Sequence, residues 1–297
     1  MWLVFAFVSA FATPLTPITA KIGIKNVNSD FATFYRTGIV ILGSLAMCLI
    51  TGSLPSFSSL TWENWLYLAL SGLCTGLSWL CYYRAIKLGD VSKVAPIDKS
   101  SFILSSVLFL IFFFPETTKG GDGLTIGMLF LSMALMLAGT LLMIGKIEKG
   151  QPLSKAWLFY AVLSAVFAGL VSFFCKLGLS GIPTDLGTLI RTVIVFLFSG
   201  AIVLARKEYK GVSALTGKDW VFLSVSGLFT GVAWLSEYYA LNWDGSNPIA
   251  VNSIGKLSIL LTMLFSFLFL KEKFTKKSLL GLAFLTAGIV LIIVFSL

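Results

Sequence analysis

The chain has 297 residues, of which 57% are hydrophobic and only 12% are charged, and its formal net charge is +9. A soluble domain of this composition would have too little polar surface to cover itself, which excludes an ordinary soluble protein. The sequence has no histidine, and its four cysteines lack metal-ligand spacing, which argues against a metal site, a disulfide framework and most acid-base catalysis. We therefore predict no bound metal and no cofactor.

Apolar runs of roughly 18 to 24 residues recur along the whole chain, and each is about long enough for a helix to cross a ~30 Å hydrocarbon core. The first run has no basic residue ahead of it and is interrupted by Pro14 and Pro17, so we interpret it as a retained helix and not as a signal peptide. No segment is left for a soluble domain. In chain order, the ten predicted transmembrane spans are Trp2–Ala20, Phe31–Thr51, Trp65–Ala85, Val91–Phe113, Leu124–Gly145, Ala156–Lys176, Leu186–Ala205, Trp220–Leu241, Pro248–Leu270 and Ser278–Leu297.

The distribution of basic residues predicts the orientation of these spans. The charge is spread over short loops and forms no basic face, which argues against binding to nucleic acid. Sixteen of the 22 Lys and Arg residues follow the odd-numbered spans, so we expect those loops in the cytoplasm and both termini outside, in a plasma (inner) membrane protein. The sixteen are Lys21, Lys25, Arg84, Lys87, Lys93, Lys146, Lys149, Lys155, Arg206, Lys207, Lys210, Lys218, Lys271, Lys273, Lys276 and Lys277.

The chain also matches itself at an offset of 155 residues. The shared Arg, Lys, Asp, Trp and Gly residues lie at fixed positions, so the match exceeds what two apolar segments share by composition. Three blocks carry it: AKIGI from Ala20 faces CKLGL from Cys175, DFATFYRTGIV from Asp30 faces DLGTLIRTVIV from Asp185, and SGLCTGLSWLCYYRAI from Ser71 faces SGLFTGVAWLSEYYAL from Ser226. With a shift of two residues, DKSSFIL from Asp98 faces GKLSILL from Gly255.

Five spans per half is an odd number, so the second copy must enter the membrane from the other side. The predicted fold is therefore an all-α integral membrane protein of ten transmembrane helices, in two inverted five-helix repeats around a central cavity. We expect the first repeat at residues 1–150 and the second at residues 151–297. Such a repeat suits transport by alternating access.

Each half resembles an EamA-type unit of the drug/metabolite transporter (DMT) superfamily. The resemblance covers essentially the whole chain and is carried by the arginine entering the second span of each half, by the aromatic third span, and by two longer stretches: VAPIDKSSFILSSVLFL from Val94 and LFLKEKFTKKSLLGLAFLTAGIVLII from Leu268. The first half departs from the pattern at PETTKGGDG, from Pro115, where the family has a tight acidic turn. The resemblance implies a ten-helix basket in which the fifth and tenth helices lie outside the cavity, but it implies no substrate.

Two intramembrane lysines, Lys99 and Lys256, are equivalent in the repeat and are the strongest candidate substrate-binding residues. A lysine near the bilayer centre costs roughly 2.5–3.5 kcal/mol, so it needs a partner or a function. In the sugar-phosphate branch of the superfamily, lysines on the equivalent helices hold a phosphate, so the resemblance implies an anion site. The alternative is a structural pairing inside the protein, with Asp98 or Asp90 for Lys99 and with Glu237 for Lys256.

Glu237 replaces Tyr82 of the first repeat and could carry a proton or bind an ammonium group, although a helix-end carboxylate could also reach water. Asp98, next to Lys99, is a further candidate substrate-binding residue, and the remaining candidates are aromatic or basic. Trp79, Tyr83, Trp234 and Tyr238, spaced by four, either wall the cavity or belong to interface belts. Arg36 and Arg191 lie only five or six residues into their spans, so snorkelling to the interface competes with a role in gating or coupling.

The sequence thus favours a secondary transporter of a small anionic or zwitterionic metabolite, proton-coupled or exchanging. Alternatives are an exporter of hydrophobic or cationic compounds, in which the lysines are internally paired, and a flippase of a lipid-linked phosphate. An enzyme is disfavoured because the sequence has no histidine, no paired intramembrane carboxylates and no phosphate-binding glycine loop. The expected partners are the substrate and the bilayer, with the protein as a monomer or weak homodimer.

Overall fold

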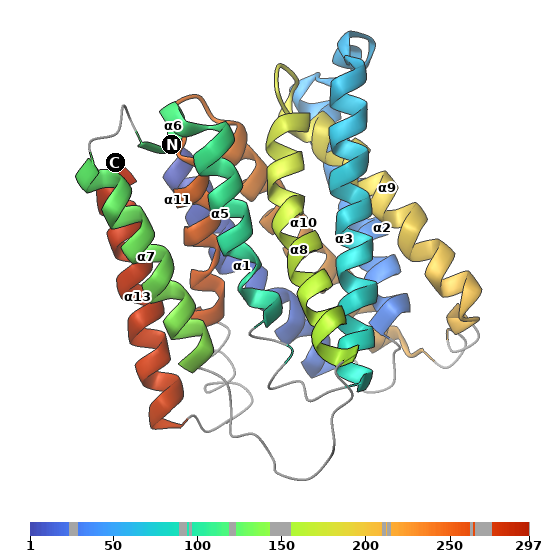
Figure 1. Cartoon of the computed structure of the whole chain (residues 1–297). Helices are drawn as coiled ribbons and strands as arrows, with labels where there is room; N and C mark the ends of the chain where they lie inside the picture. Colours follow the sequence, from blue (N-terminus) through green and yellow to red (C-terminus); the bar gives the residue numbers. More distant parts are fainter. Residues whose placement is uncertain are drawn as a thin grey trace.

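The computed structural model describes residues 1–23, 29–88, 94, 97–118, 123–142, 156–209, 212, 215–261, 264 and 275–296. Within these residues the chain is all helical, without a strand (Figure 1). The helices are α1 (Trp2–Gly23), α2 (Ser29–Thr51), the 3₁₀ turn η1 (Leu54–Ser59), α3 (Trp62–Leu88), α5 (Ser101–Phe112), α6 (Phe114–Thr118), α7 (Gly123–Leu142), α8 (Ala156–Gly178), α9 (Thr184–Ala205), α10 (Gly217–Asn242), α11 (Pro248–Gly255) and α13 (Lys276–Ser296).

Seven of the described helices are long and apolar enough to cross a bilayer: α2, α3, α7, α8, α9, α10 and α13. Residues 2–16 of α1 and residues 248–261 form shorter apolar helices, and α5 has 12 residues. Each predicted span overlaps one of these described helical segments, although parts of the fourth, fifth, ninth and tenth predicted spans lie outside the described residues. The all-helical membrane fold is confirmed, and the count of ten spans stays a prediction.

The starts of two helices, α10 and α11, are set by local side-chain hydrogen bonds. Thr216 and Asp219 form a reciprocal capping box at the start of α10, in which each side chain accepts from the other's backbone N–H. At the start of α11, the side chain of Asn247 accepts from Ile249 and Ala250, and Pro248 occupies a position where a missing N–H is harmless. The Asn247 cap starts α11 only a short loop after the end of α10.

The helix bounds repeat with the offset seen in the sequence. Adding 155 to the bounds of α1, α2 and α3 gives those of α8, α9 and α10 to within one residue. The chain begins at the upper end of α1, whereas α8 begins at the lower end of the bundle, so the equivalent helices run in opposite directions (Figure 1). This arrangement agrees with an inverted repeat, and the predicted boundary at residue 150 falls in segment 143–155, outside the described residues.

Contacts between helices also recur when each helix is replaced by its equivalent in the other half. Helix α3 packs against α8 just as α10 packs against α1, and α10 contacts α2 just as α3 contacts α9. Helices α2 and α9 pack against each other, as do α7 and α13. In Figure 1, α7 and α13 stand as a pair at one side of the bundle. The position of these two helices agrees with the resemblance, which places the fifth and tenth spans outside the basket.

Equivalent polar residues of the two halves also make equivalent contacts. Asp30, at the start of α2, binds Arg206, at the end of α9. The equivalent carboxylate, Asp185, accepts hydrogen bonds from Thr51 and Ser53 at the end of α2. The neighbours α2 and α9 are therefore tied together at both ends, by an ion pair at one end and by hydroxyl groups at the other.

Helices α7 and α13 approach closely because glycines lie between them. A Cβ atom on Gly139 would lie 2.5 Å from the backbone of Gly281 and of Leu285, and one on Gly288 would lie 2.7 Å from the carbonyl oxygen of Ser132. Small residues allow such approach in a membrane, where the hydrophobic effect does not drive helix association. This pair is held by backbone proximity.

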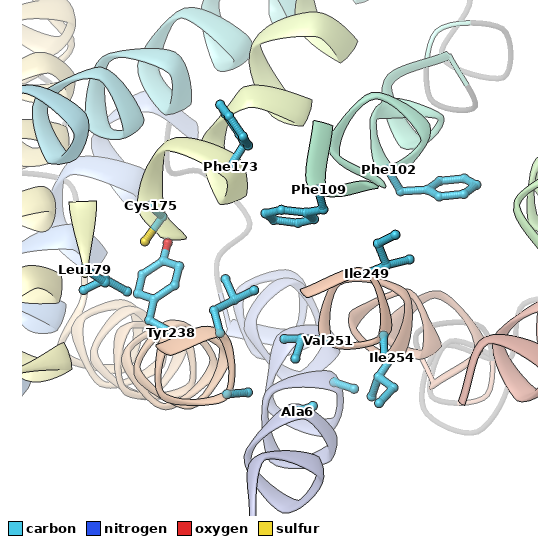
Figure 2. Close-up of a cluster of buried hydrophobic side chains, with 14 of the residues drawn as sticks. Ala6, Phe102, Phe109, Phe173, Cys175, Leu179, Tyr238, Ile249, Val251 and Ile254 are labelled. Carbon is cyan, nitrogen blue, oxygen red and sulfur yellow. The ribbon is translucent and has the colours of Figure 1, made fainter. Parts of the chain in front are cut away.

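The largest buried cluster joins helices from both halves. It contains Phe102 and Phe109 of α5, Phe173 and Cys175 of α8, Tyr238 of α10, and several aliphatic residues of α11. Figure 2 shows these side chains converging from α1, α5, α8, α10 and α11, with the Tyr238 hydroxyl next to Cys175. The candidate site residues of α10 therefore border the central core.

Candidate substrate site

Lys99 and Asp98 lie in a helical turn directly before α5. The ammonium group of Lys99 is 3.8 Å from the Asp98 carboxylate, and the Lys99 side chain is 55% exposed whereas Asp98 is 14% exposed. Ser164 of α8 donates a hydrogen bond of 2.6 Å to Asp98. Asp98 is thus fixed between two elements, and Lys99 keeps donors available. Asp90, the other partner considered for Lys99, lies outside the described residues.

Lys256 caps the end of α11, where the helix is interrupted before residues 257–261 continue it. Its charged neighbours are Lys99, Glu237 and Asp98. The two lysines therefore lie within electrostatic reach of each other, from equivalent positions of the two halves. Two carboxylates, Asp98 and Glu237, are also neighbours, so the group contains charges of both signs.

Both lysines lie at breaks in their helices. Around Lys99, the backbone N–H groups of Ser100 and Ile103 each donate to the carbonyl three residues earlier. Around Lys256, the backbone N–H groups of Lys256 and Ile259 also donate to the carbonyl three residues earlier. Such tighter turns interrupt regular helical bonding, and discontinuous helices are typical of binding sites in secondary transporters. Just before Lys256, the side-chain atoms Asn252 Nδ2 and Ser253 Oγ are buried without a hydrogen-bond partner in the described part of the chain.

Glu237 of α10 links two basic neighbourhoods. Its charged neighbours are Lys256 and Arg191, and Ser172 of α8 donates to its Oε1 at 3.4 Å. The side chain is half-buried, and these neighbours come from α8, α9 and the end of α11. A carboxylate between two cations can balance their charge or exchange a proton.

Arg191 of α9 is buried, with 1% of the residue exposed. Its Nε donates to Ser71 at 2.8 Å and its Nη2 donates to Thr75 at 2.6 Å, both on α3. The rings of Trp234 and Tyr238 lie 4.9 and 5.1 Å from the guanidinium carbon. The side chain therefore does not snorkel to the interface, and cation–π contacts stabilise its charge.

The equivalent arginine, Arg36, is less deeply buried. It donates to its own helix at Ala32 and Thr33 and, at 3.5 Å, to Ser226 of α10. Ser226 in turn donates to the carbonyl of Thr16, as Ser71 donates to that of the equivalent Val171. The arginine–serine pairing is thus present in both halves, with different surroundings.

The predicted aromatic residues fall in different places. Trp234 and Tyr238 flank Arg191, whereas Trp79 lines a small hollow with Asp30 and Thr33 of α2 and residues of α9. The side chain of Tyr83 lies outside the described part of the chain. The structure therefore groups Trp234, Tyr238 and Glu237 of α10 with Arg191.

Sequence reasoning missed the hydroxyl groups that position these charges. Ser71 and Thr75 hold Arg191, Ser164 holds Asp98, and Ser172 contacts Glu237. A signal for the first two was present, because SGLCTG from Ser71 and SGLFTG from Ser226 repeat both the Ser and the Thr. Serine and threonine are common in membrane helices as packing residues, so their presence alone did not mark a site.

The larger hollows in the described part of the chain lie on the outer surface and are apolar. One is lined by Val4, Phe7 and Phe11 of α1 with Phe229 of α10, and another by residues of α13 such as Leu279 and Leu282. Neither contains the site lysines. Both are lined almost wholly by apolar side chains.

Sequence families agree with this architecture. The EamA-like transporter family matches the chain over residues 1–138 and 155–294. The chain belongs to the EamA-like transporter family. The two matched segments correspond to its two halves, and membership makes the protein a multi-pass membrane transporter.

Individual relatives add the fold and the class of activity. An uncharacterized transporter in the cobO 3′ region of a Sinorhizobium species is 41% identical over 143 residues, which are 48% of this chain and all of that protein. A solved crystal structure aligns with a TM-score of 0.72 and 16% identity, covering 97% of this chain and 94% of the other. The latter similarity shows a shared fold.

Proposed function

We propose that this EamA-like transporter moves a small anionic or zwitterionic metabolite by alternating access. The observation that carries the proposal is the charged group formed by Lys99, Asp98, Glu237 and Lys256, contributed by the turn before α5, by α10 and by the end of α11. Ionisable residues inside a membrane protein are expensive to bury and usually serve a substrate or ion pathway. The helix breaks at both lysines support the same location.

Glu237 provides a route to coupling. In the inverted repeat it stands where the first half has Tyr82, so the pair of lysines is symmetric whereas the carboxylate is present once. A carboxylate that balances Lys256 in the empty site and takes up a proton when substrate binds would link the two events. The proposal therefore assigns the lysines to the substrate and Glu237 to proton coupling or exchange.

The experiment is a thermal-unfolding screen of the detergent-purified full chain against a panel of anionic and zwitterionic metabolites. A ligand that binds the folded state raises its unfolding temperature. We expect stabilisation by an anion, weakened at least about tenfold in affinity in Lys256→Gln because a charge-assisted contact is lost. Lys218→Gln, which removes an exposed charge near the start of α10, is the matched control.

The screen also separates the competing transporter. Stabilisation by hydrophobic cations, retained in Lys256→Gln and lost in Glu237→Gln, would replace the anion assignment with export of cationic compounds. Stabilisation by no anion at all would overturn the proposal.

A further inference from the structure

One donor atom of Arg191 is left unused by the protein. Its Nε and Nη2 are bound to Ser71 and Thr75, but Nη1 is buried and has no hydrogen-bond partner among the described residues. A buried charged donor without an acceptor carries a desolvation penalty, which an oxygen atom of a ligand would remove. Arg191 is an electrostatic neighbour of Glu237, so a ligand bound at Nη1 would lie near the charged group described above.

The charge of Arg191 is stabilised by neutral groups. None of the ion pairs among the described residues includes it. Glu237 is an electrostatic neighbour of Arg191, but Lys256 has the larger electrostatic effect on Glu237. Hydroxyl groups and ring faces hold the guanidinium in place without cancelling its charge, so its attraction for an anion is retained.

The equivalent position in the other half differs in this respect. All three guanidinium nitrogens of Arg36 have acceptors, namely the Ala32 carbonyl, Ser226 and Thr33. The unsatisfied nitrogen is therefore not a property of this motif position in general. It belongs to the half that also contains Glu237.

The nitrogen without a partner sets the direction from which an anion can bind. The guanidinium carbon lies over the rings of Trp234 and Tyr238, and hydroxyl groups occupy two of the three nitrogens. An acceptor for Nη1 approaches in the guanidinium plane, because the N–H bonds lie in that plane. A planar carboxylate can place an oxygen atom there and form a charge-assisted hydrogen bond.

We propose that Arg191 binds the carboxylate group of the transported metabolite, an inference that rests on the proposed function above. Ser71 and Thr75 are positioning residues that hold the guanidinium, and Nη1 donates the charge-assisted hydrogen bond to the substrate. The lysines at the helix breaks then serve other polar groups of the same substrate.

The test compares small carboxylic acids with the matched primary amides, using amino acids and keto acids together with the amide of each. Thermal unfolding of the purified full chain measures the affinity for each member of a pair. We expect acids to stabilise the protein and amides not to do so. Arg191→Lys keeps the positive charge but loses the planar set of guanidinium N–H donors. The affinity of this variant for the carboxylic acids should fall at least about tenfold.

Arg36→Lys is the matched control and should keep the preference for acids. If Arg191→Lys keeps it as well, the inference is wrong. If phosphates stabilise the wild-type protein and carboxylates do not, the inference is also wrong although the proposed function stands. If no anion stabilises the wild-type protein, the proposed function fails together with the inference.

A second measurement needs no variant. Butane-2,3-dione modifies arginine side chains, and peptide mass spectrometry reads the rate at Arg191 and Arg36 separately in the wild-type protein. A stabilising carboxylate should slow the modification of Arg191 and leave that of Arg36 unchanged. An unreactive Arg191, or an equal rate with and without the acid, would overturn the proposal even if Arg191→Lys does not fold.

Discussion

Single buried side chains join the ends of helices that lie far apart in the sequence. Asn64 in the first turn of α3 is 4% exposed, and its Nδ2 donates to the carbonyls of Gly178 and Ser180 at 3.0 and 2.9 Å. Its Oδ1 accepts from Thr61, so the amide caps its own helix and also satisfies the end of α8. Unpaired carbonyls at a helix end need such partners.

We predict that Asn64→Asp destabilises the protein by about 2–3 kcal/mol, because a carboxylate would oppose two carbonyl oxygens and lose both donors. Asp219→Asn, at the equivalent position in α10, keeps the cap and should change stability by less than about 1 kcal/mol. Denaturation of the two purified variants measures both effects. Equal losses would show that the contact with α8 contributes nothing.

Lys176 at the end of α8 makes several contacts at once. Its ammonium group donates to the Leu241 carbonyl at 2.7 Å, lies 3.2 Å from Glu116, and stands 5.7 Å from the ring centre of Phe113. The lysine is 12% exposed whereas Glu116 is 43% exposed. The ends of α8 and α10 and the short α6 therefore meet at one cation.

We predict unequal effects of removing the two charged partners. Lys176→Met should lower stability by about 1–3 kcal/mol, since it removes a buried charge-assisted hydrogen bond. Glu116→Gln should cost less than about 1 kcal/mol because an exposed carboxylate gains little from an ion pair. Thermal melts in detergent compare the variants, and a larger loss for Glu116→Gln would reverse this ranking.

At the scale of helices, the α7–α13 pair depends on backbone proximity and not on side-chain volume. Gly139 lies within 2.5 Å of the partner's backbone, measured from an added Cβ, whereas Gly127 of the same helix has open space around it. Substitution at Gly139 therefore tests the packing between the two helices, whereas substitution at Gly127 tests only helix propensity.

We predict that Gly139→Ala destabilises the protein by about 1–3 kcal/mol, because the new methyl group would force two backbones apart. Gly127→Ala should leave stability unchanged or raise it by up to about 1 kcal/mol, since alanine favours the helix. Unfolding of the two variants checks the difference. Similar behaviour of both would contradict the close contact.

At the scale of the whole molecule, the helix bounds, the packing pairs and several hydrogen bonds of one half recur in the other half. The two halves differ at the residues for which a function is proposed. Asp185 is held by hydroxyl groups where Asp30 is held by an arginine, Arg191 is more buried than Arg36, and Glu237 replaces a tyrosine. A transporter with a two-fold scaffold still needs an asymmetric site to bind an asymmetric substrate.

The orientation inferred from the basic loops is testable by labelling. Ser58 in η1 and Lys218 at the start of α10 are exposed. The start of α3, next to η1, contacts the end of α8, and the end of α8 contacts the end of α10, so the two positions lie toward opposite ends of the bundle. We predict that Ser58→Cys reacts with a membrane-impermeant thiol reagent in intact cells, and that Lys218→Cys reacts only after permeabilisation. The native cysteines Cys48, Cys74 and Cys175 are buried, which limits background labelling. The reverse pattern would invert the topology.

The sequence by itself determined the helical membrane fold, because a long apolar run can satisfy its backbone in lipid only as a helix. It also determined the repeat, since an offset of 155 residues is visible without coordinates. The lysines at equivalent positions followed from the cost of burying charge.

Only the tertiary structure decided which polar groups meet. Ser71 and Thr75 bind Arg191 because α3 packs against α9 across the two halves, and a helix's own periodicity does not reveal its neighbour. The same packing buries Arg191 and leaves Nη1 without a partner, whereas Arg36 satisfies its nitrogens largely within its own helix. Two arginines with equivalent sequence contexts thus acquire different chemistry, because the environment of a charge depends on residues distant in the chain.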